Sequence, residues 1–265
     1  MSYKSLALSS LAVVLSFFGS VQYSGSASAA TVLGTAEGFA VLAGSAVTNT
    51  GASTINGDVG ATSGISGLGS ATVTGTTHLS DAASQAALTD ASTAYTYLRS
   101  LPSTSNLTGQ DLGGLTLTSG VYTYDSSAQL TGTLTLDFGG LSNQLIVVNM
   151  GSTLTTASGS SVIEKNGNST DKVFFLAGSS ATLGSGTELI GSVLANMSVT
   201  MNSGASILYG RAIGLTGAVT MIDNTVNVSA VPLPAALPLF GAAIVGLVGL
   251  SMRRKSAKNN ANAYS

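Results

Sequence analysis

The sequence predicts a mainly β fold: a discontinuous three-sided parallel β-helix (solenoid) with one long α-helix packed along one face. Two observations predict it. A unit of about 19 residues recurs through the C-terminal half of the chain, and a related unit stands more than a hundred residues earlier. Apolar and polar residues alternate at the same place in each unit. A fixed period near 20 with strand-like residues is typical of a solenoid, in which each coil is buried against its neighbours.

Five copies of the unit are present, one near the N-terminus and four in succession. The N-terminal copy, residues 39–60, aligns with residues 173–194 when Gly44 is set under Gly178. One copy is lengthened by a polar insertion near residues 164–171. We expect the N-terminal copy to stack beside the last coils, as one more coil of the same solenoid. The four successive copies are Leu145–Lys172, Val173–Gly191, Ser192–Gly210 and Arg211–Ser229.

Each unit contains two kinds of predicted strand. One kind alternates apolar with small or polar residues, which marks a strand buried on one face only; examples are residues 181–184, 199–202 and 219–222. The other kind is apolar throughout, as in residues 146–148 and 173–176, which indicates burial on both faces. Another element must therefore cover the second side of the solenoid.

The predicted cover is a helix over residues 80–100. Small and apolar residues recur there at helical spacing, which gives the helix one face that can approach the sheet closely. Ser80 or Asp81 can cap its start, and Pro102 lies just past its end. The Gly/Ser/Thr-rich residues 61–76 are expected to form a loop or cap over one end of the solenoid. The expected buried positions of the helix are Ala83, Ala87, Ala91, Ala94 and Leu98.

Both ends of the chain resemble processing segments. A basic residue, a short apolar run and an Ala-x-Ala site within residues 1–29 are typical of a secretory signal peptide. The domain itself is expected to occupy residues 30–230. Within residues 31–230 there are four basic and eleven acidic residues, a net charge of −7, which disfavours a nucleic-acid partner.

The C-terminal residues 231–265 form a predicted sorting signal. The sequence Val231-Pro232-Leu233-Pro234-Ala235 precedes an apolar stretch over residues 237–252, expected to be a transmembrane helix, and a basic tail. This arrangement resembles the PEP-CTERM class of sorting signals in its VPLPA variant, although it lacks a Pro-Glu-Pro core. The resemblance implies an exosortase-type processing enzyme as a partner and exposure at the cell surface or release. A permanent single-span anchor is the alternative.

The residues give no support for an enzyme. The chain has no cysteine and one histidine, His78, so neither thiolate chemistry nor a histidine pair for a metal is available. No phosphate-binding loop or calcium-loop motif occurs, and no cofactor is expected. Isolated aspartates, namely Asp58, Asp111, Asp137 and Asp223, fit roles in turns at the coil ends.

Five stretches of the chain carry the motifs of one known family: residues 38–60, 111–122, 128–137, 151–162 and 173–224. At these stretches the chain resembles the microbial ice-binding domain family. The resemblance implies a discontinuous β-solenoid with an adjacent helix that adsorbs to ice and inhibits ice growth or recrystallisation. An adhesin or structural protein of the cell surface or biofilm matrix, with an exopolysaccharide as a partner, is the alternative on the same scaffold.

A binder of ice needs a flat, uncharged and regular surface, and outward threonines on stacked coils would provide it. Their β-branched side chains are rigid at χ1, and stacked strands lie about 4.8 Å apart. The first predicted ladder is Thr48, Thr155, Thr182, Thr200 and Thr220, and the rank two residues further on is Thr50, Ala157, Gly184, Asn202 and Ile222. The second predicted ladder, interrupted by a charge and therefore less suitable, is Thr54, Ser161, Glu188, Ser206 and Thr225.

Overall fold

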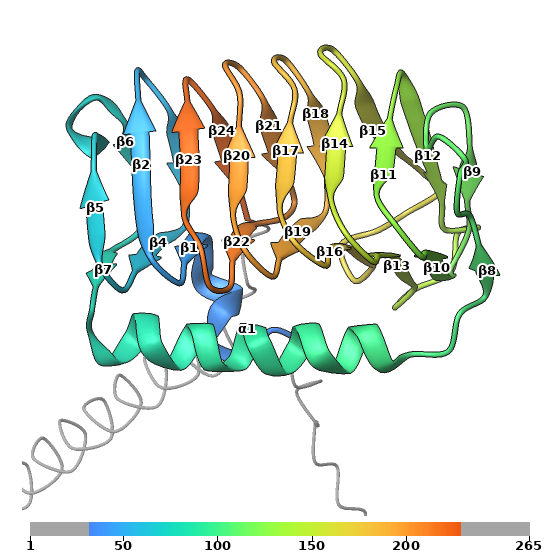
Figure 1. The fold of residues 1–265 in the computed structure, drawn as a ribbon, viewed down its shortest axis with the longest axis horizontal. Coiled ribbons are helices and arrows are strands. Elements are labelled where there is room, and N and C mark those ends of the chain that lie inside the picture. The colour runs from blue at the N-terminus through green and yellow to red at the C-terminus, as the bar shows by residue number, and fades with distance from the viewer. Residues whose placement is uncertain (1–31, 229–265) are drawn as a thin grey trace, which may run out of the picture. The chain divides into compact units, whose positions relative to one another are not determined.

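The computed structural model describes residues 32–228, which fold as a three-sided parallel β-solenoid with one long helix alongside it (Figure 1). The predicted signal peptide over residues 1–29 and the predicted sorting signal over residues 231–265, with its apolar stretch 237–252, lie outside these residues. Within residues 32–228, no helix is both long enough and apolar enough to cross a membrane. The mainly β prediction is confirmed.

Three parallel sheets form the sides of the solenoid. Sheet A has nine strands, sheet B seven and sheet C eight. In spatial order, sheet A contains β7 (Thr77–Leu79), β4 (Asp58–Ala61), β1 (Phe39–Ala43), β22 (Ala212–Gly214), β19 (Ser192–Ala195), β16 (Lys172–Ala177), β13 (Leu145–Met150), β10 (Gly120–Tyr124) and β8 (Ser105–Asn106).

Sheets B and C follow the same stacking order. Sheet B contains β5 (Gly64–Ser66), β2 (Ala46–Thr50), β23 (Val219–Ile222), β20 (Val199–Met201), β17 (Ala181–Leu183), β14 (Leu154–Thr156) and β11 (Ala128–Leu130). Sheet C contains β6 (Thr72–Val73), β3 (Thr54–Asn56), β24 (Thr225–Asn227), β21 (Ser206–Leu208), β18 (Glu188–Ile190), β15 (Ser161–Lys165), β12 (Thr133–Asp137) and β9 (Thr116–Leu117).

The N-terminal coil stacks against the last coil, as the repeat predicts. In sheet A, Val41 pairs with Ala212, and in sheet B, Thr48 pairs with Thr220. The solenoid is therefore discontinuous in sequence, because the coil formed by β1, β2 and β3 follows β22, β23 and β24 in space. Figure 1 shows the blue N-terminal strands beside the orange C-terminal ones.

Residues 61–76 form more than the expected loop or cap. They contribute β5, the short 3-10 turn η2 (Leu68–Ser70) and β6, and so build part of a further coil. Ile65 pairs with Val47 in sheet B, and Thr72 pairs with Thr54 in sheet C. The loop alternative is wrong, because the edges of β2 and β3 supply hydrogen-bond partners for a segment of low strand propensity. The expected place over one end of the solenoid is right, because β5 and β6 are terminal strands of sheets B and C.

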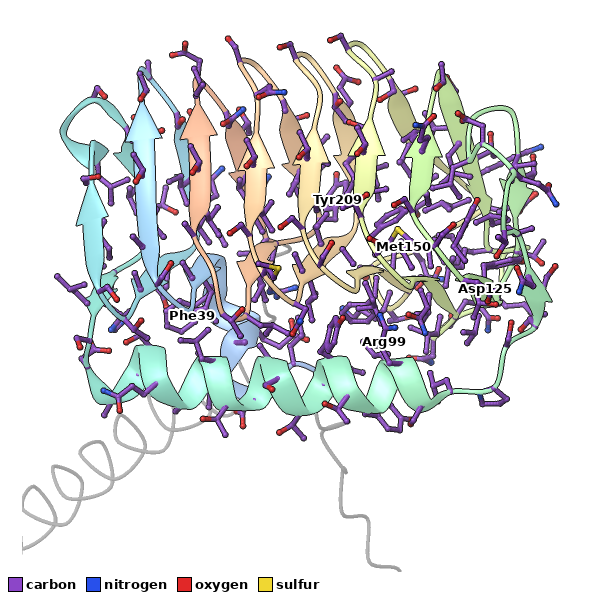
Figure 2. All side chains as sticks on the ribbon, viewed as in Figure 1. Phe39, Arg99, Asp125, Met150 and Tyr209 are labelled. Carbon is purple, nitrogen blue, oxygen red and sulfur yellow. The ribbon has the colours of Figure 1, made fainter. Side chains whose placement is uncertain are left out.

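The helix α1 (Ala82–Ser100) lies along sheet A, parallel to the stacking direction (Figure 1). Asp81 caps its start by accepting a 2.8 Å hydrogen bond from the Ser84 amide. The predicted buried position Ala83 is wrong: Ala83 is exposed, and Ser84 occupies that place on the buried face. Arg99 near the other end reaches the sheet and donates a 3.0 Å bond to the Met150 carbonyl (Figure 2).

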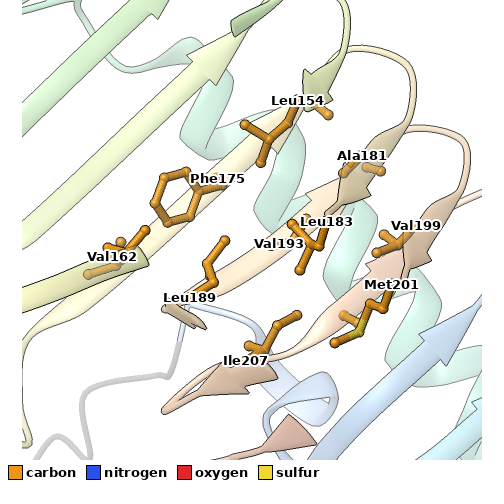
Figure 3. Packing of buried hydrophobic residues seen from close by; sticks show 14 of the residues in the cluster. Leu154, Val162, Phe175, Ala181, Leu183, Leu189, Val193, Val199, Met201 and Ile207 are labelled. Carbon is orange, nitrogen blue, oxygen red and sulfur yellow. The ribbon is translucent and has the colours of Figure 1, made fainter. Parts of the chain in front are cut away.

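Two apolar clusters hold the fold together, one on each face of sheet A. The first fills the interior of the solenoid, where residues from all three sheets meet; Leu154, Phe175 and Met201 are among those labelled in Figure 3. The second lies between sheet A and the helix, where Ala87, Ala91 and Leu98 cover outward residues of sheet A such as Phe174 and Ile213. Burial on both faces explains the continuous apolar runs of this sheet.

The aspartates assigned to turns do hold the coils together. Asp111 Oδ1 accepts bonds from the amides of Gly113 (2.6 Å) and Thr131 (2.8 Å). Burial acts to raise the pKa of Asp111, but these hydrogen bonds outweigh it and the pKa is lowered. Asp223 Oδ1 accepts a 2.7 Å bond from the Ala52 amide, 171 positions away in sequence. Both carboxylates therefore accept their hydrogen bonds from backbone amides.

Candidate functional site

The outer face of sheet B carries the predicted threonine ladder. Alternation along each short strand directs one residue into the core and the next outward, as in β20, where Val199 and Met201 are buried and Thr200 is half-exposed. The same parity holds in β17 and β23. The ladder therefore results from the same parity in strands that pair in direct register.

The five predicted threonines pair directly with one another in an unbroken row. The register joins Thr155 to Thr182, Thr182 to Thr200, Thr200 to Thr220 and Thr220 to Thr48. Adjacent parallel strands lie about 4.8 Å apart, so the row repeats at about that interval. All five side chains are half-exposed or exposed. The structure therefore brings the five predicted threonines together in one row.

The row extends one residue beyond the predicted ladder at each end. Gln129 pairs with Thr155 at one end, and Ser66 pairs with Thr48 at the other; both are exposed. The signal for Gln129 was available, because Ala128-Gln129-Leu130 has the same parity as Val199-Thr200-Met201. The Gly/Ser/Thr-rich composition of residues 61–76 gives no such signal for Ser66.

The second predicted rank is only partly formed. Thr50 pairs with Ile222, and both side chains are outside the core. Ala157 and Asn202 follow the ends of their strands, where the chain already turns towards sheet C. Gly184 is buried, so its predicted place on the exposed surface is wrong. The exposed surface is therefore one complete row with a fragmentary second row beside it.

A buried cluster of hydroxyl groups explains why Gly184 is drawn inward. The side chain of Thr156 points into the corner between sheets B and C, where its Oγ1 accepts a 2.9 Å bond from the Gly184 amide. The same Oγ1 lies 2.7 Å from Thr187 Oγ1. An added Cβ at Gly184 would lie 2.5 Å from the Thr156 carbonyl oxygen, so only glycine fits this turn.

The threonine hydroxyls of the row are available to solvent. None of the five makes a side-chain hydrogen bond to another group within residues 32–228, whereas on sheet C the Thr133 and Ser161 hydroxyls bond each other at 2.9 Å. The strands of sheet B contain no charged residue. A row of free hydroxyl and methyl groups on an uncharged sheet can order water without binding ions.

Sheet C makes a different surface. Its outward ladder is present as predicted, with Ser161 paired to Glu188, Glu188 to Ser206 and Ser206 to Thr225; Thr225 in turn pairs with Thr54. Glu188 is exposed in the middle of it, and Glu164 and Lys165 lie at the end of β15. Partial burial, and secondarily the charge of Asp171, raise the pKa of Glu164. These charges make sheet C unsuited to a neutral crystalline surface.

Among the titratable side chains of the described residues that could act as metal ligands, His78 has a structural partner. Within residues 32–228 there is no cluster of three metal-ligating side chains. His78 lies 2.7 Å from the carboxylate of the helix cap Asp81 and stacks at a tilt on Phe39. His78 therefore contacts the start of the helix through its cap residue.

Comparison with known proteins decides the family. The sequence profile of the Ice-binding-like family matches residues 41–227, which include both parts of the discontinuous solenoid. The chain belongs to the Ice-binding-like family. An ice-binding protein of Nostoc sp. (strain HG1) is 51% identical over 212 residues, covering 79% of this chain and 78% of the relative. One from Flavobacterium frigoris (strain PS1) is 32% identical over 213 residues, covering 74% and 75% respectively.

Solved structures of the Ice-binding-like family share this fold. The crystal structure of an ice-binding protein from the Antarctic ascomycete Antarctomyces psychrotrophicus superposes with a TM-score of 0.71 at 40% identity, covering 75% of this chain and 98% of that one. A glycosylated ice-binding protein from an Arctic yeast gives 0.66 at 28% identity, covering 76% and 95%. Each of these relatives is named for ice binding and none as an enzyme or an adhesin, so the adhesin alternative gains no support.

Proposed function

We propose that this protein adsorbs to ice through the outer face of sheet B and thereby inhibits ice growth or recrystallisation. The single observation that carries the proposal is the unbroken row from Thr155 through Thr182, Thr200 and Thr220 to Thr48. Membership of the Ice-binding-like family supports ice as the ligand, and the row supports sheet B as the surface that binds it.

The physical argument rests on rigidity and neutrality. Each threonine is fixed by a short β-strand that is paired on both sides and by a β-branched side chain with few rotamers. Its methyl group forms no hydrogen bonds with water. Its hydroxyl, which has no protein partner in residues 32–228, can hold one water molecule by a hydrogen bond. Repetition at about 4.8 Å along the row orders these waters before the crystal is reached. Adsorption then costs little additional ordering entropy, because the surface is already rigid.

The incomplete second rank limits the matched area. Thr50 and Ile222 extend the surface at one end of sheet B, but the buried Gly184 interrupts it near the middle. We therefore expect binding to depend mainly on the first row. A substitution at Thr200, near the centre of that row, should have a larger effect than one at Gln129 at its end.

The proposal is tested by partition of the fluorescently labelled full chain into slowly growing ice. Thr200→Lys should reduce the fraction incorporated by at least tenfold, because a charged side chain cannot be accommodated by neutral ice. Thr225→Lys is the matched control: Thr225 is equally half-exposed but lies on sheet C. Equal incorporation of both variants and the unmodified chain would refute the proposal for sheet B.

We further propose that the protein is exported and acts outside the cell. Residues 1–29 have the composition of a signal peptide, and the VPLPA-type tail over residues 231–265 supports recognition by an exosortase-type enzyme after transient anchoring. Association with exopolysaccharide or the cell surface would then follow. Mass spectrometry of the protein secreted by its native host tests this, since a chain that keeps both segments would contradict processing.

A further inference from the structure

Sheet C carries an apolar rank that is partly exposed in the described residues 32–228. Two residues past the paired Ser161 and Glu188 stand Ile163, which is 47% exposed, and Ile190. Ile190 pairs in turn with Leu208 on the next strand. Both Ile190 and Leu208 are half-buried, and Ile190 packs on one side against the interior cluster. Three aliphatic side chains thus run across adjacent strands at the edge where sheet C turns into sheet A.

Tyr209 extends this rank, and its backbone is strained. In sheet C Leu208 pairs with Ile190, while in sheet A Ala212 pairs with Val193. The turn after Leu208 therefore contains one more residue than the turn after Ile190, and the extra residue is Tyr209. It has a φ of 53°, which is unfavourable for a tyrosine, and its side chain is 63% exposed. The unfavourable backbone conformation and the exposed ring together point to a contact of Tyr209 outside residues 32–228.

The described part of the chain ends beside the turn that contains Tyr209. Asn227 pairs with Leu208, and its carbonyl accepts a 3.1 Å hydrogen bond from Gly210, the residue after Tyr209. The next segment, residues 229–236, reads SAVPLPAA. Its two prolines favour an extended or polyproline conformation, and its apolar Val231 and Leu233 alternate with them.

We propose that residues 229–236 dock on sheet C, with Pro232 and Pro234 against Tyr209 and the rank formed by Leu208, Ile190 and Ile163. Proline-rich segments bind aromatic-lined surfaces because they are already extended and lose little entropy on binding. The reach is sufficient: the rank extends about three strand spacings, roughly 14 Å, from Asn227, and eight extended residues span about 26 Å.

Docking there would fix the orientation of the domain relative to any C-terminal anchor. The edge between sheets C and A is the edge of the three-sided solenoid opposite sheet B. A chain held at this edge points any C-terminal anchor away from the threonine row and leaves sheet B free. The inference does not depend on ice binding, and the following experiment measures docking without ice.

The test uses engineered cysteine pairs in the full chain, held in detergent micelles, because the sequence contains no cysteine. Ala235→Cys is combined with either Ser206→Cys or Thr54→Cys. Ser206 and Thr54 both pair with Thr225 from opposite sides and are both half-exposed, so they lie equally near the exit of the chain. Only Ser206 lies on the strand that carries Leu208 and precedes Tyr209.

We expect the Ser206 pair to form its disulfide at least ten times faster than the Thr54 pair. Adding Tyr209→Asn should remove this difference, and the fold is kept because asparagine tolerates a positive φ. Equal rates in the two pairs overturn the proposal. Covalent dimers formed by Ser206→Cys alone would assign the surface to a second copy, and quenching of a dye at Ser206 by brominated lipid vesicles would assign it to a membrane surface; either result also overturns it.

Discussion

The guanidinium of Arg211 donates to both the backbone carbonyl and the carboxylate of Glu37, a residue 174 positions earlier. Glu37 belongs to the 3-10 turn η1 (Gly34–Gly38), which precedes β1, and Arg211 precedes β22. Both side chains are buried. Burial lowers the pKa of Arg211, and the charge of Glu37 opposes that shift. This ion pair joins the N-terminal coil to the last coil where the solenoid is discontinuous.

Arg211→Met should lower the free energy of unfolding by about 3–5 kcal/mol, because Glu37 would remain buried without its partner. Urea unfolding of the purified chain measures this. Arg99→Met is the control, since Arg99 is only half-buried and bonds the Tyr95 hydroxyl and one carbonyl. A loss at Arg211 no larger than that at Arg99 would show that the pair does not hold the two coils together.

Leu183→Ala should lower the free energy of unfolding by about 2–5 kcal/mol, because it leaves a cavity among close-packed coils. Leu183 is fully buried, while Leu141, at 62% exposure, offers a matched control for which the change should stay within about 0.5 kcal/mol. Thermal and urea unfolding measure both. Similar losses in the two variants would contradict the assignment of the inner parity.

Stability should fall as the solution becomes acidic. A hydrogen bond from the Ser84 amide, and then His78, lower the pKa of Asp81 to about 2. The pKa of Asp90 is lowered by its bonds from the hydroxyl and amide of Thr35. Because these values lie below those of the unfolded chain, the stabilisation is complete above about pH 4 and is lost as the pH falls towards 2.

The midpoint of thermal unfolding, followed between about pH 6 and pH 2, tests this expectation. Asp81→Asn should flatten the dependence, because asparagine still caps the helix but does not titrate in this range. A midpoint that stays constant or rises on acidification would contradict the role of these carboxylates.

The threonine row should tolerate loss of a hydroxyl better than loss of a methyl group. Thr200→Val keeps the β-branched shape and its single preferred rotamer, whereas Thr200→Ser gains rotameric freedom. We expect the valine variant to retain at least half of the recrystallisation inhibition and the serine variant to retain less. The opposite order would show that the hydroxyl, rather than the rigid methyl-bearing surface, dominates adsorption.

The sequence predicted the interior and the first row because both follow from parity. A residue such as Thr182, between Ala181 and Leu183, can only point outward if its neighbours point inward. Parity does not say where a strand ends, and this is why Gly184 was misplaced: Thr156 draws it into a buried corner through a bond between distant coils. The composition of residues 61–76 predicts a loop, but pairing with β2 and β3 makes strands of part of this segment. This pairing also joins parts of the chain that local sequence patterns do not connect.

Recrystallisation inhibition by the double variant Thr182→Tyr, Thr200→Tyr tests the central claim most directly. These two threonines pair in the middle of sheet B, and two tyrosines there would hold the surface away from ice. The matched variant Ser206→Tyr, Thr225→Tyr places the same rings on paired positions of sheet C. We predict that inhibition is lost in the first variant and kept in the second, with unfolding midpoints unchanged. Full inhibition by the first variant would contradict ice binding through sheet B.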